Sequence, residues 1–392
     1  MYSYMRRRLG FLLLLALLLL TLPACVGARM GVSWPAVGLI DLNGQTHIAL
    51  SYNNDVTLLT PSNGAPARLV NPLNGDVLRD NDNNPRTWVL RGSENEGAQF
   101  HTLPIRIDDE TVLVADHNRR LLRVDSVVVE VQRSFPLVDK VVASPLEADG
   151  MLYVPFQNGG LSAISLEDYR ESWFFPTAAG IWAQPLLVND MLILASIDHF
   201  LYAVDRSTGQ RLWSVDLGGA VASTPLLAND RLYVGSFNKS FFEISLDGAI
   251  LAEYATQNWV WGTPAMDENG IVYVTDLSGY VHALDSSSGG LRERWSVQIA
   301  ERGIRAGPVV FEERVIVASR DGKVYWLDRF DGELINAREI DDRPELLGDM
   351  LLLQPSDTLD IDEPLLLVTS VHDGRLLIAF GVDGRQTWVY PR

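Results

Sequence analysis

Cysteine is almost absent from this chain, since Cys25 is the single one among 392 residues. An internal disulfide is therefore excluded, and so is a site built on a C-x-x-C pair. The six histidines show no H-x-x-x-H spacing, and no G-x-S-x-G or P-loop pattern is present. Basic residues are outnumbered by acidic ones, 32 against 50, which gives a formal charge of −18. A surface this acidic repels phosphate groups, so we expect no nucleic acid as a partner.

Long apolar runs are missing too, except at the N-terminus. Leu9–Leu20 is an apolar core that follows three arginines, Arg6–Arg8, and precedes the string T-L-P-A-C that ends at Cys25. It is short for a bilayer span, which needs about 20 residues. The arrangement predicts a secretory signal peptide. An uncleaved anchor over Leu9–Val26 is the alternative, which Pro23 disfavours because proline interrupts a helix.

The L-P-A-C string resembles the lipobox of bacterial lipoproteins, in which the cysteine is acylated and becomes the first residue of the mature chain. The resemblance implies a signal peptide over residues 1–24, lipidation of Cys25, a linker over 25–33 and a folded domain over 34–392. It also implies an extracytoplasmic protein that is anchored in the membrane by lipid. The anchor would lie in the outer membrane if the organism has one, and otherwise on the outer face of the cytoplasmic membrane.

Short apolar runs recur along the rest of the chain at a fixed spacing. Five of them begin 40 residues apart, at Leu121, Leu161, Leu201, Phe241 and Val281. Another run begins before them at Val56, and two more follow longer loops, at Val324 and Leu376. Eight units with a period of about 40 to 45 residues are typical of a propeller or of a helical array.

One unit, Gln184–Val215, decides between strands and helices. It contains four runs of four to six residues, rich in Val, Ile, Leu, Tyr and Trp, with turn sequences such as Asn189–Asp190 and Arg206–Gly209 between them. No later segment has the length and 3.6-residue period of a helix of more than one or two turns. The sequence therefore predicts an all-β fold, a monomeric eight-bladed β-propeller of four-stranded antiparallel blades, with seven blades as the alternative.

The end of this unit carries a family resemblance. A-V-D-R-S-T-G-Q-R-L-W (Ala203–Trp213) resembles the A-x-D-x-x-T-G-x-x-x-W repeat of pyrroloquinoline-quinone-type (PQQ-like) propellers, and W-L-D-R-F-D-G-E-L (Trp326–Leu334) is a degraded copy. The resemblance implies that the repeat tryptophans pack between adjacent blades, while Asp and Gly shape the turn. These tryptophans are Trp173, Trp213, Trp295 and Trp388.

The same resemblance brings in PQQ-dependent dehydrogenases, so an enzyme is one alternative. Those enzymes have a Ca²⁺ site, a catalytic Asp and usually an adjacent cysteine pair, and this chain has no second cysteine. A clamp for an anionic quinone needs basic groups, of which the loops offer chiefly Arg305. We therefore expect a protein that is not an enzyme and holds no cofactor and no metal. Binding of a small ligand or a polysaccharide is a further alternative, because exposed tryptophan faces suit sugars.

A lipid-anchored propeller of this repeat type resembles the BamB lipoprotein family. Its members are eight-bladed scaffolds without cofactor that bind periplasmic modules of the outer-membrane β-barrel assembly machine. The resemblance implies a non-catalytic interaction scaffold with a protein partner in the cell envelope. It also implies a docking surface that includes the loops leading into the innermost strands.

Five such loops can be aligned on a proline: K-V-V-A-S-P, G-I-W-A-Q-P, A-V-A-S-T-P, W-V-W-G-T-P and G-I-R-A-G-P. Four residues before the proline the side chain is always β-branched, and two before it is always small, because strands crowd near the axis of a ring. The position between them varies freely, and strand alternation should turn it toward the channel mouth or solvent. Its occupants are our candidate partner-binding residues: Val142, Trp182, Ala222, Trp261 and Arg305.

Tryptophan and arginine are enriched at binding hot spots, which favours this assignment. The alternative is that Trp182 and Trp261 plug the central channel.

Two polar segments lie elsewhere. Asp80–Asn84 is expected to be an Asn-rich loop of a long insertion in the first blade. The acidic segment Ser356–Glu363 is expected to join the first two strands of the last blade as a solvated loop.

Overall fold

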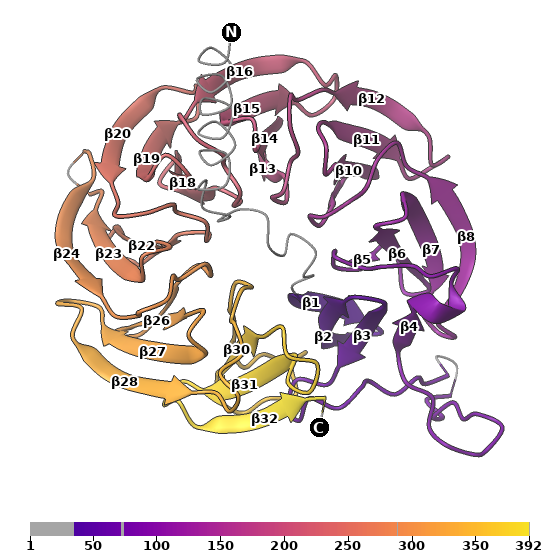
Figure 1. The fold of residues 1–392 in the computed structure, drawn as a ribbon. Coiled ribbons are helices and arrows are strands. Elements are labelled where there is room, and N and C mark those ends of the chain that lie inside the picture. Colours follow the sequence, from indigo (N-terminus) through magenta and orange to yellow (C-terminus); the bar gives the residue numbers. More distant parts are fainter. Residues whose placement is uncertain (1–34, 72–73, 288, 392) are drawn as a thin grey trace, which may run out of the picture. The chain divides into compact units, whose positions relative to one another are not determined.

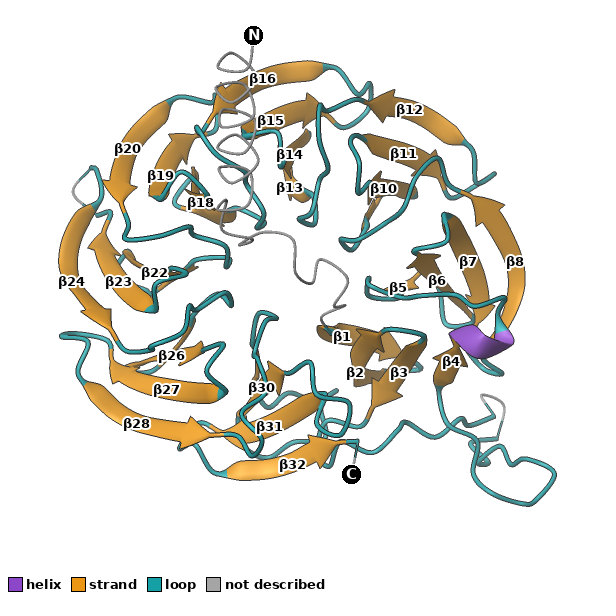
Figure 2. Ribbon diagram, in the orientation of Figure 1, coloured by secondary structure: helices purple, strands orange, loops and turns teal. Residues whose placement is uncertain are grey.

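The computed structural model describes residues 35–71, 74–287 and 289–391, which form a ring of eight four-stranded antiparallel sheets (Figure 1). The eight-bladed propeller predicted from the repeats is confirmed, and the seven-bladed alternative is wrong. In the described residues the one helical element is a single 3-10 turn, η1 (Gly92–Glu94), drawn purple in Figure 2. The predicted signal peptide 1–24, Cys25 and the linker 25–33 lie outside the described residues.

The first four blades follow the chain in order, with their strands listed from the axis outward. Blade 1 has β1 (Ala36–Leu42), β2 (Gln45–Tyr52), β3 (Asp55–Leu59) and β4 (Val89–Arg91). Blade 2 has β5 (Ile105–Arg106), β6 (Thr111–Asp116), β7 (Arg120–Asp125) and β8 (Glu130–Pro136). Blade 3 has β9 (Leu146–Ala148), β10 (Met151–Pro155), β11 (Leu161–Ser165) and β12 (Glu171–Phe175). Blade 4 has β13 (Leu186–Val188), β14 (Met191–Ala195), β15 (Phe200–Asp205) and β16 (Arg211–Asp216).

The remaining four blades continue the series without interruption. Blade 5 has β17 (Leu226–Ala228), β18 (Arg231–Ser236), β19 (Ser240–Ser245) and β20 (Ile250–Ala255). Blade 6 has β21 (Ala265–Met266), β22 (Ile271–Thr275), β23 (Tyr280–Asp285) and β24 (Arg292–Gln298). Blade 7 has β25 (Val309–Phe311), β26 (Arg314–Ala318), β27 (Lys323–Asp328) and β28 (Leu334–Glu339). Blade 8 has β29 (Leu351–Leu353), β30 (Leu365–Thr369), β31 (Leu377–Gly381) and β32 (Gln386–Tyr390).

The second and third strands of each blade are nearly continuous apolar runs. In blade 4, β14 and β15 are almost fully buried, whereas the outer strand β16 is mostly half-buried or exposed. A strand that packs against a neighbouring blade on each of its two faces has no polar side, so its sequence does not alternate. The repeats are therefore recognised in the sequence by short apolar runs rather than by alternating polar and apolar residues.

The hydrophobic core is divided among the blade interfaces. The described residues form eight core clusters, and each cluster combines side chains from two adjacent blades. The cluster that contains Tyr233 and Phe241 of blade 5, for example, also contains Val272 and Val274 of blade 6. Each blade is therefore stabilised by its two neighbours rather than by a core of its own.

The repeat tryptophans pack between blades, as predicted. The Trp213 indole donates its N–H to the Leu246 carbonyl oxygen in the next blade at 2.9 Å. Its ring lies on Gly248, whose φ is +88° and where a Cβ atom would approach the ring within 2.7 Å, so only glycine fits that turn. Trp295 and Trp388 make the same bond to the Arg329 and Pro61 carbonyl oxygens, at 2.9 and 3.0 Å. The ring of Trp173 lies over Gly209 in the same way.

Trp88 is a further member of this set that the repeat alignment missed. Its indole N–H donates to the Ser126 carbonyl oxygen of blade 2 at 3.0 Å. A long insertion between β3 and β4 lengthens the sequence spacing before it, and Figure 1 shows this insertion as the excursion at the rim. Within the insertion Asp80 accepts the backbone N–H groups of Asp82 and Asn84, as expected of a polar loop.

Blades 8 and 1 share no strand, because each blade consists of four consecutive strands. Trp388 and one core cluster close this junction. The acidic segment Ser356–Glu363 does join β29 and β30, but it is not simply a solvated loop. The Thr46 backbone N–H donates to the Thr358 carbonyl oxygen at 3.0 Å, and the Ser62 hydroxyl donates to Asp360 Oδ2 at 2.6 Å. The segment therefore fastens blade 8 to blade 1.

Candidate protein-binding face

Two sets of connections meet at one end of the propeller. Antiparallel strands alternate in direction, so the loops from each fourth strand to the next blade lie at the same end as the turns between second and third strands. We call this end the loop face and the opposite end the turn face. The loops between successive blades from blade 2 to blade 8 cover residues 137–145, 176–185, 217–225, 256–264, 299–308 and 340–350.

Backbone hydrogen bonds fix each loop to the turns of both blades that it joins. The Ile181 N–H donates to the Phe156 carbonyl oxygen of blade 3 at 3.0 Å, and the Gly180 carbonyl accepts the Ile197 N–H of blade 4 at 2.9 Å. The same pair of bonds recurs in the next three loops, through the backbones of Val221 and Ala220, Val260 and Trp259, and Ile304 and Gly303. The loop face is thus a rigid backbone frame.

This frame explains the sequence pattern. The β-branched residues at the hydrogen-bonded position are at most 1% exposed, and the small residues two positions later are also buried. The side chain between them is not held by the frame, which allows it to vary. Val142, Trp182 and Trp261 are partly exposed there, as expected. Ala222 and Arg305 are only 7% and 9% exposed, so the expectation that they reach solvent is wrong.

Arg305 is covered because it folds onto Trp261. Its guanidinium carbon lies 4.1 Å from the centre of the Trp261 ring, a close cation–π contact. The two loops approach closely, since a Cβ atom on Gly262 would lie 2.4 Å from the Gly307 nitrogen. Two of the five candidate residues are therefore brought together, one from each of two successive loops.

Two further aromatic rings extend this pair. Phe237, in the turn between β18 and β19, stacks on Trp259 with ring centres 4.8 Å apart and planes 4° apart. The same phenylalanine meets Trp261 at 4.9 Å. We call Phe237, Trp259, Trp261 and Arg305 the aromatic cluster. All four belong to connections of the loop face, and the three aromatic side chains are partly exposed.

The charge of Arg305 is retained inside this cluster. Burial lowers the pKa of its guanidinium to about 10, with the nearby Asp349 opposing the shift, so the group is protonated at neutral pH. Desolvation raises the pKa of Asp349, although its carboxylate accepts the Gly307 N–H at 2.5 Å. A cation that has lost most of its water contributes more strongly to a cation–π contact than an exposed one.

The other tryptophan among the candidates makes different contacts. The Trp182 indole N–H donates to the Gln157 carbonyl oxygen at 3.2 Å, and its ring passes over Gly180, where a Cβ atom would lie 2.5 Å from the indole nitrogen. The Gln157 carbonyl oxygen would lie closer still, 2.0 Å from that Cβ atom, and this backbone contact accounts for the glycine of G-I-W-A-Q-P. Val142 and Ala222 occupy the corresponding position in the loops on either side.

Sequence reasoning missed Phe237 and Trp259. Trp259 begins the aligned string W-V-W-G-T-P, yet its position carries Lys, Gly or Ala in the other loops, so nothing in the alignment marked it. Phe237 lies more than 20 residues earlier in a different blade. The Val260 N–H donates to the Ser236 carbonyl oxygen at 3.3 Å and so holds the turn of Phe237 beside the loop of Trp259.

A serine–histidine–aspartate chain in blade 6 looks superficially catalytic. His282 Nδ1 lies 2.8 Å from the Ser296 hydroxyl, and His282 Nε2 lies 3.4 Å from Asp276 Oδ2. His282 and Asp276 are fully buried, so no substrate can reach the histidine. Burial alone would raise the pKa of Asp276, but hydrogen bonds from His282 and backbone N–H groups outweigh it and lower the pKa. The three side chains link neighbouring strands of blade 6 through polar contacts.

The described residues also bear on metal binding and on membrane crossing. Across residues 35–71, 74–287 and 289–391, no group of three or more His, Cys, Asp or Glu side chains could hold a metal ion. In the same part of the chain, no helix combines the length and the apolar character needed to cross a membrane.

Fold and site together define the class: an eight-bladed β-propeller of PQQ-like repeats with an aromatic cluster on a rigid loop face. The sequence model described as outer membrane protein assembly factor BamB matches residues 176–257 and 246–392, which together are more than half of the chain. This chain therefore belongs to that family. No curated protein matches it in sequence.

A solved structure supports the fold independently. The crystal structure of BamB from Moraxella catarrhalis superimposes with a TM-score of 0.60, over 88% of this chain and 93% of that chain. The two sequences are 15% identical. At this level of identity the similarity establishes the shared propeller architecture.

Proposed function

We propose that this protein is a non-catalytic, lipid-anchored scaffold of the cell envelope that binds a protein partner through its loop face during outer-membrane protein assembly. One observation carries the proposal: partly exposed aromatic rings pack against one another on connections whose backbones are fixed by hydrogen bonds. Rigid aromatic side chains with an adjacent arginine are the usual anchors of protein interfaces. Because the frame is preformed, little conformational entropy is lost on binding.

The enzyme alternative is less well supported by the same contacts. A quinone clamp needs a basic side chain that can reach an anionic ligand, and Arg305 is committed to the Trp261 ring and 9% exposed. Polysaccharide binding needs open tryptophan faces, and one face of Trp259 is covered by Phe237. The three rings are nevertheless partly exposed, which suits contact with a protein partner.

The test is binding of the purified protein to the periplasmic domain of the host's barrel-assembly protein, measured by surface plasmon resonance. The double variant Trp259→Ala/Trp261→Ala should bind roughly thirtyfold or more weakly, since a single hot-spot residue contributes about 2 kcal/mol or more. Trp182→Ala is the matched control, because it removes a tryptophan from the corresponding loop position outside the cluster. It should change the affinity less.

Thermal unfolding of each variant separates binding from folding. If the double variant binds normally, the proposed site is wrong. If its melting temperature falls steeply and the loss of binding follows the unfolded fraction, the rings act as a channel plug instead.

The membrane anchor is a separate part of the proposal. Cys25, which lies outside the described residues, is the proposed acylation site, and residues 1–24 are the proposed signal peptide. Cys25→Ala should shift the protein from the membrane pellet to the soluble extracytoplasmic fraction after cell fractionation. Continued retention in membranes washed with high salt would contradict the lipid anchor.

A further inference from the structure

Blade 7 exposes an unusual group of apolar side chains at the turn face. Phe330, Leu334 and Ile335 are 64%, 55% and 53% exposed, and all three lie within six residues of the chain. They occupy the turn after β27 and the start of β28, the outermost strand of the blade. Single exposed apolar residues are ordinary on a protein surface, whereas a contiguous group marks an interaction site.

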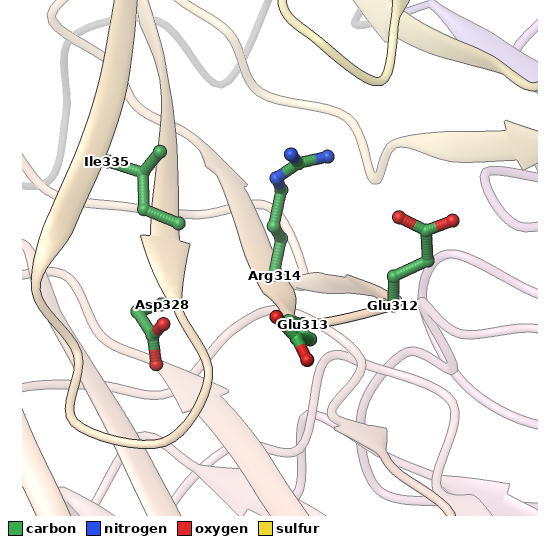
Figure 3. Close-up of a pocket in the computed structure, with 5 residues that line it drawn as sticks. All are labelled: Glu312, Glu313, Arg314, Asp328 and Ile335. Atoms are coloured by element: carbon green, nitrogen blue, oxygen red, sulfur yellow. The ribbon is translucent and has the colours of Figure 1, made fainter.

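An open pocket of about 320 Å³ adjoins this group (Figure 3). It is lined by one of the apolar residues, three carboxylates and one guanidinium: Ile335, Glu312, Glu313, Asp328 and Arg314. The two glutamates form the turn between β25 and β26, and Asp328 ends β27. The lining therefore carries a net negative charge beside an apolar surface.

Hydrogen bonds hold the two turns of this surface together. The Arg329 N–H donates to the Glu313 carbonyl oxygen at 3.0 Å, and Asp328 Oδ1 accepts the Phe330 N–H at 2.7 Å. The Arg329 side chain is fixed by Glu268 of blade 6 at 2.8 Å and lies under the Phe330 ring, 5.0 Å from its centre. The exposed phenylalanine is thus presented on a rigid turn rather than on a loose loop.

Blade 5 offers a comparison for this surface. Ile250 and Leu251 stand at the positions of Leu334 and Ile335 in the strand register, and they are 45% and 46% exposed. At the three acidic positions blade 5 has Asn229, Asp230 and Ser245, so it keeps only one of the three carboxylates. The exposed apolar pair recurs in the repeats, but three carboxylates next to it do not recur in blade 5.

We propose that Phe330, Leu334, Ile335 and the pocket of Glu312, Glu313 and Asp328 form a second docking surface, which takes an extended segment of a partner protein in which basic and apolar residues alternate. Charge complementarity argues for this occupant, since lysine or arginine side chains match a pocket rich in carboxylates. An extended segment fits because β28 is an edge strand with one free side and side chains that alternate in direction.

This surface is independent of the function proposed above, because it lies on the turn face and the aromatic cluster lies on the loop face. A ligand on one would leave the other open. The protein could then hold two partners at once, on opposite ends of the ring.

The test uses a fluorescent ten-residue peptide that alternates lysine with leucine, with binding to the full-length protein measured by fluorescence anisotropy. Leu334→Ser/Ile335→Ser should weaken binding by about tenfold or more, because it removes the apolar contact. Ile250→Ser/Leu251→Ser, the matched pair in blade 5, should stay within about twofold. Glu312→Gln/Glu313→Gln should weaken binding and flatten its dependence on salt.

Two results would overturn the proposal. One is equal loss of binding in the blade 5 and blade 7 pairs, which would indicate general adhesion to apolar surface. The other is equal binding of a peptide with glutamate in place of lysine, or no binding of the lysine peptide to a protein whose thermal unfolding is normal. The substituted side chains are about half or more exposed in both pairs, so the variants should remain folded.

Discussion

At the scale of single residues, blade 7 carries its large interblade side chain on the third strand instead of the fourth. In blades 3, 4, 6 and 8 an alanine on the third strand faces the interblade tryptophan on the fourth, as Ala203 faces Trp213. In blade 7 the alanine position holds Trp326 and the tryptophan position holds Asn336. The Trp326 ring still reaches the next blade, ending 3.4 Å from where a Cβ atom on Gly384 would lie. The copy that looked degraded in sequence therefore preserves the contact by another route.

This exchange predicts a compensating double variant. Trp326→Ala should lower the free energy of unfolding by about 3–5 kcal/mol, because it leaves a cavity in place of a side chain that is 1% exposed. Trp326→Ala/Asn336→Trp recreates the pair of the other blades and should recover more than half of that loss. Urea unfolding measures both free energies, with the unfolded fraction monitored by far-ultraviolet circular dichroism rather than by tryptophan fluorescence. A double variant no more stable than the single one would show that the two positions are not interchangeable.

At the scale of strands and loops, the features that recur in each repeat could be predicted from the sequence. The contacts that depend on a neighbouring loop or blade could not. Every apolar run of the 40-residue series lies on a third strand, because burial between two blades demands the same residues each time. The β-branched and small positions of the loops follow from the frame. The direction of Arg305 depends on a tryptophan in the preceding loop, and the role of Phe237 on a turn of another blade. A repeat alignment contains neither relation.

The outer strands share a feature that bears on the proposed second docking surface. In blades 2 to 8 the register between third and fourth strands shifts at one place, next to the position of the interblade tryptophan. Such bulges twist an edge strand and discourage pairing with another sheet. Recognition at β28 must therefore rely on its side chains and pocket more than on backbone pairing alone. This agrees with an experiment that changes side chains and charge.

At the scale of the whole ring, the junction between blades 8 and 1 differs from the others. The chain passes directly from one blade to the next at seven junctions, while at this one the first and the last blade meet without a loop between them. Trp388 and the clasp formed by Thr358 and Asp360 fasten it. Closure by non-covalent contacts alone makes this junction the place where opening of the ring should begin.

Two tryptophans can test this difference. Trp388→Ala and Trp213→Ala delete the same kind of contact, at the open junction and at a covalently connected one. We expect Trp388→Ala to lower the melting temperature further and to speed amide exchange in β1 to β3 and β29 to β32, because no loop holds those blades together. Hydrogen–deuterium exchange by mass spectrometry measures it. Equal exchange around both substituted junctions would show that the ring is uniformly stable.

The hydrogen-bonded frame of the loop face has a consequence for how this protein can diverge. Since the backbone bonds belong to neighbouring positions, the partly exposed side chains at positions 142 and 182 can be replaced while the backbone frame stays the same, whereas Trp261 and Arg305 have to change as a pair. Selection, or a randomised library, could change what the protein recognises through such replacements. Relatives with nearly the same backbone can therefore differ widely in what they recognise.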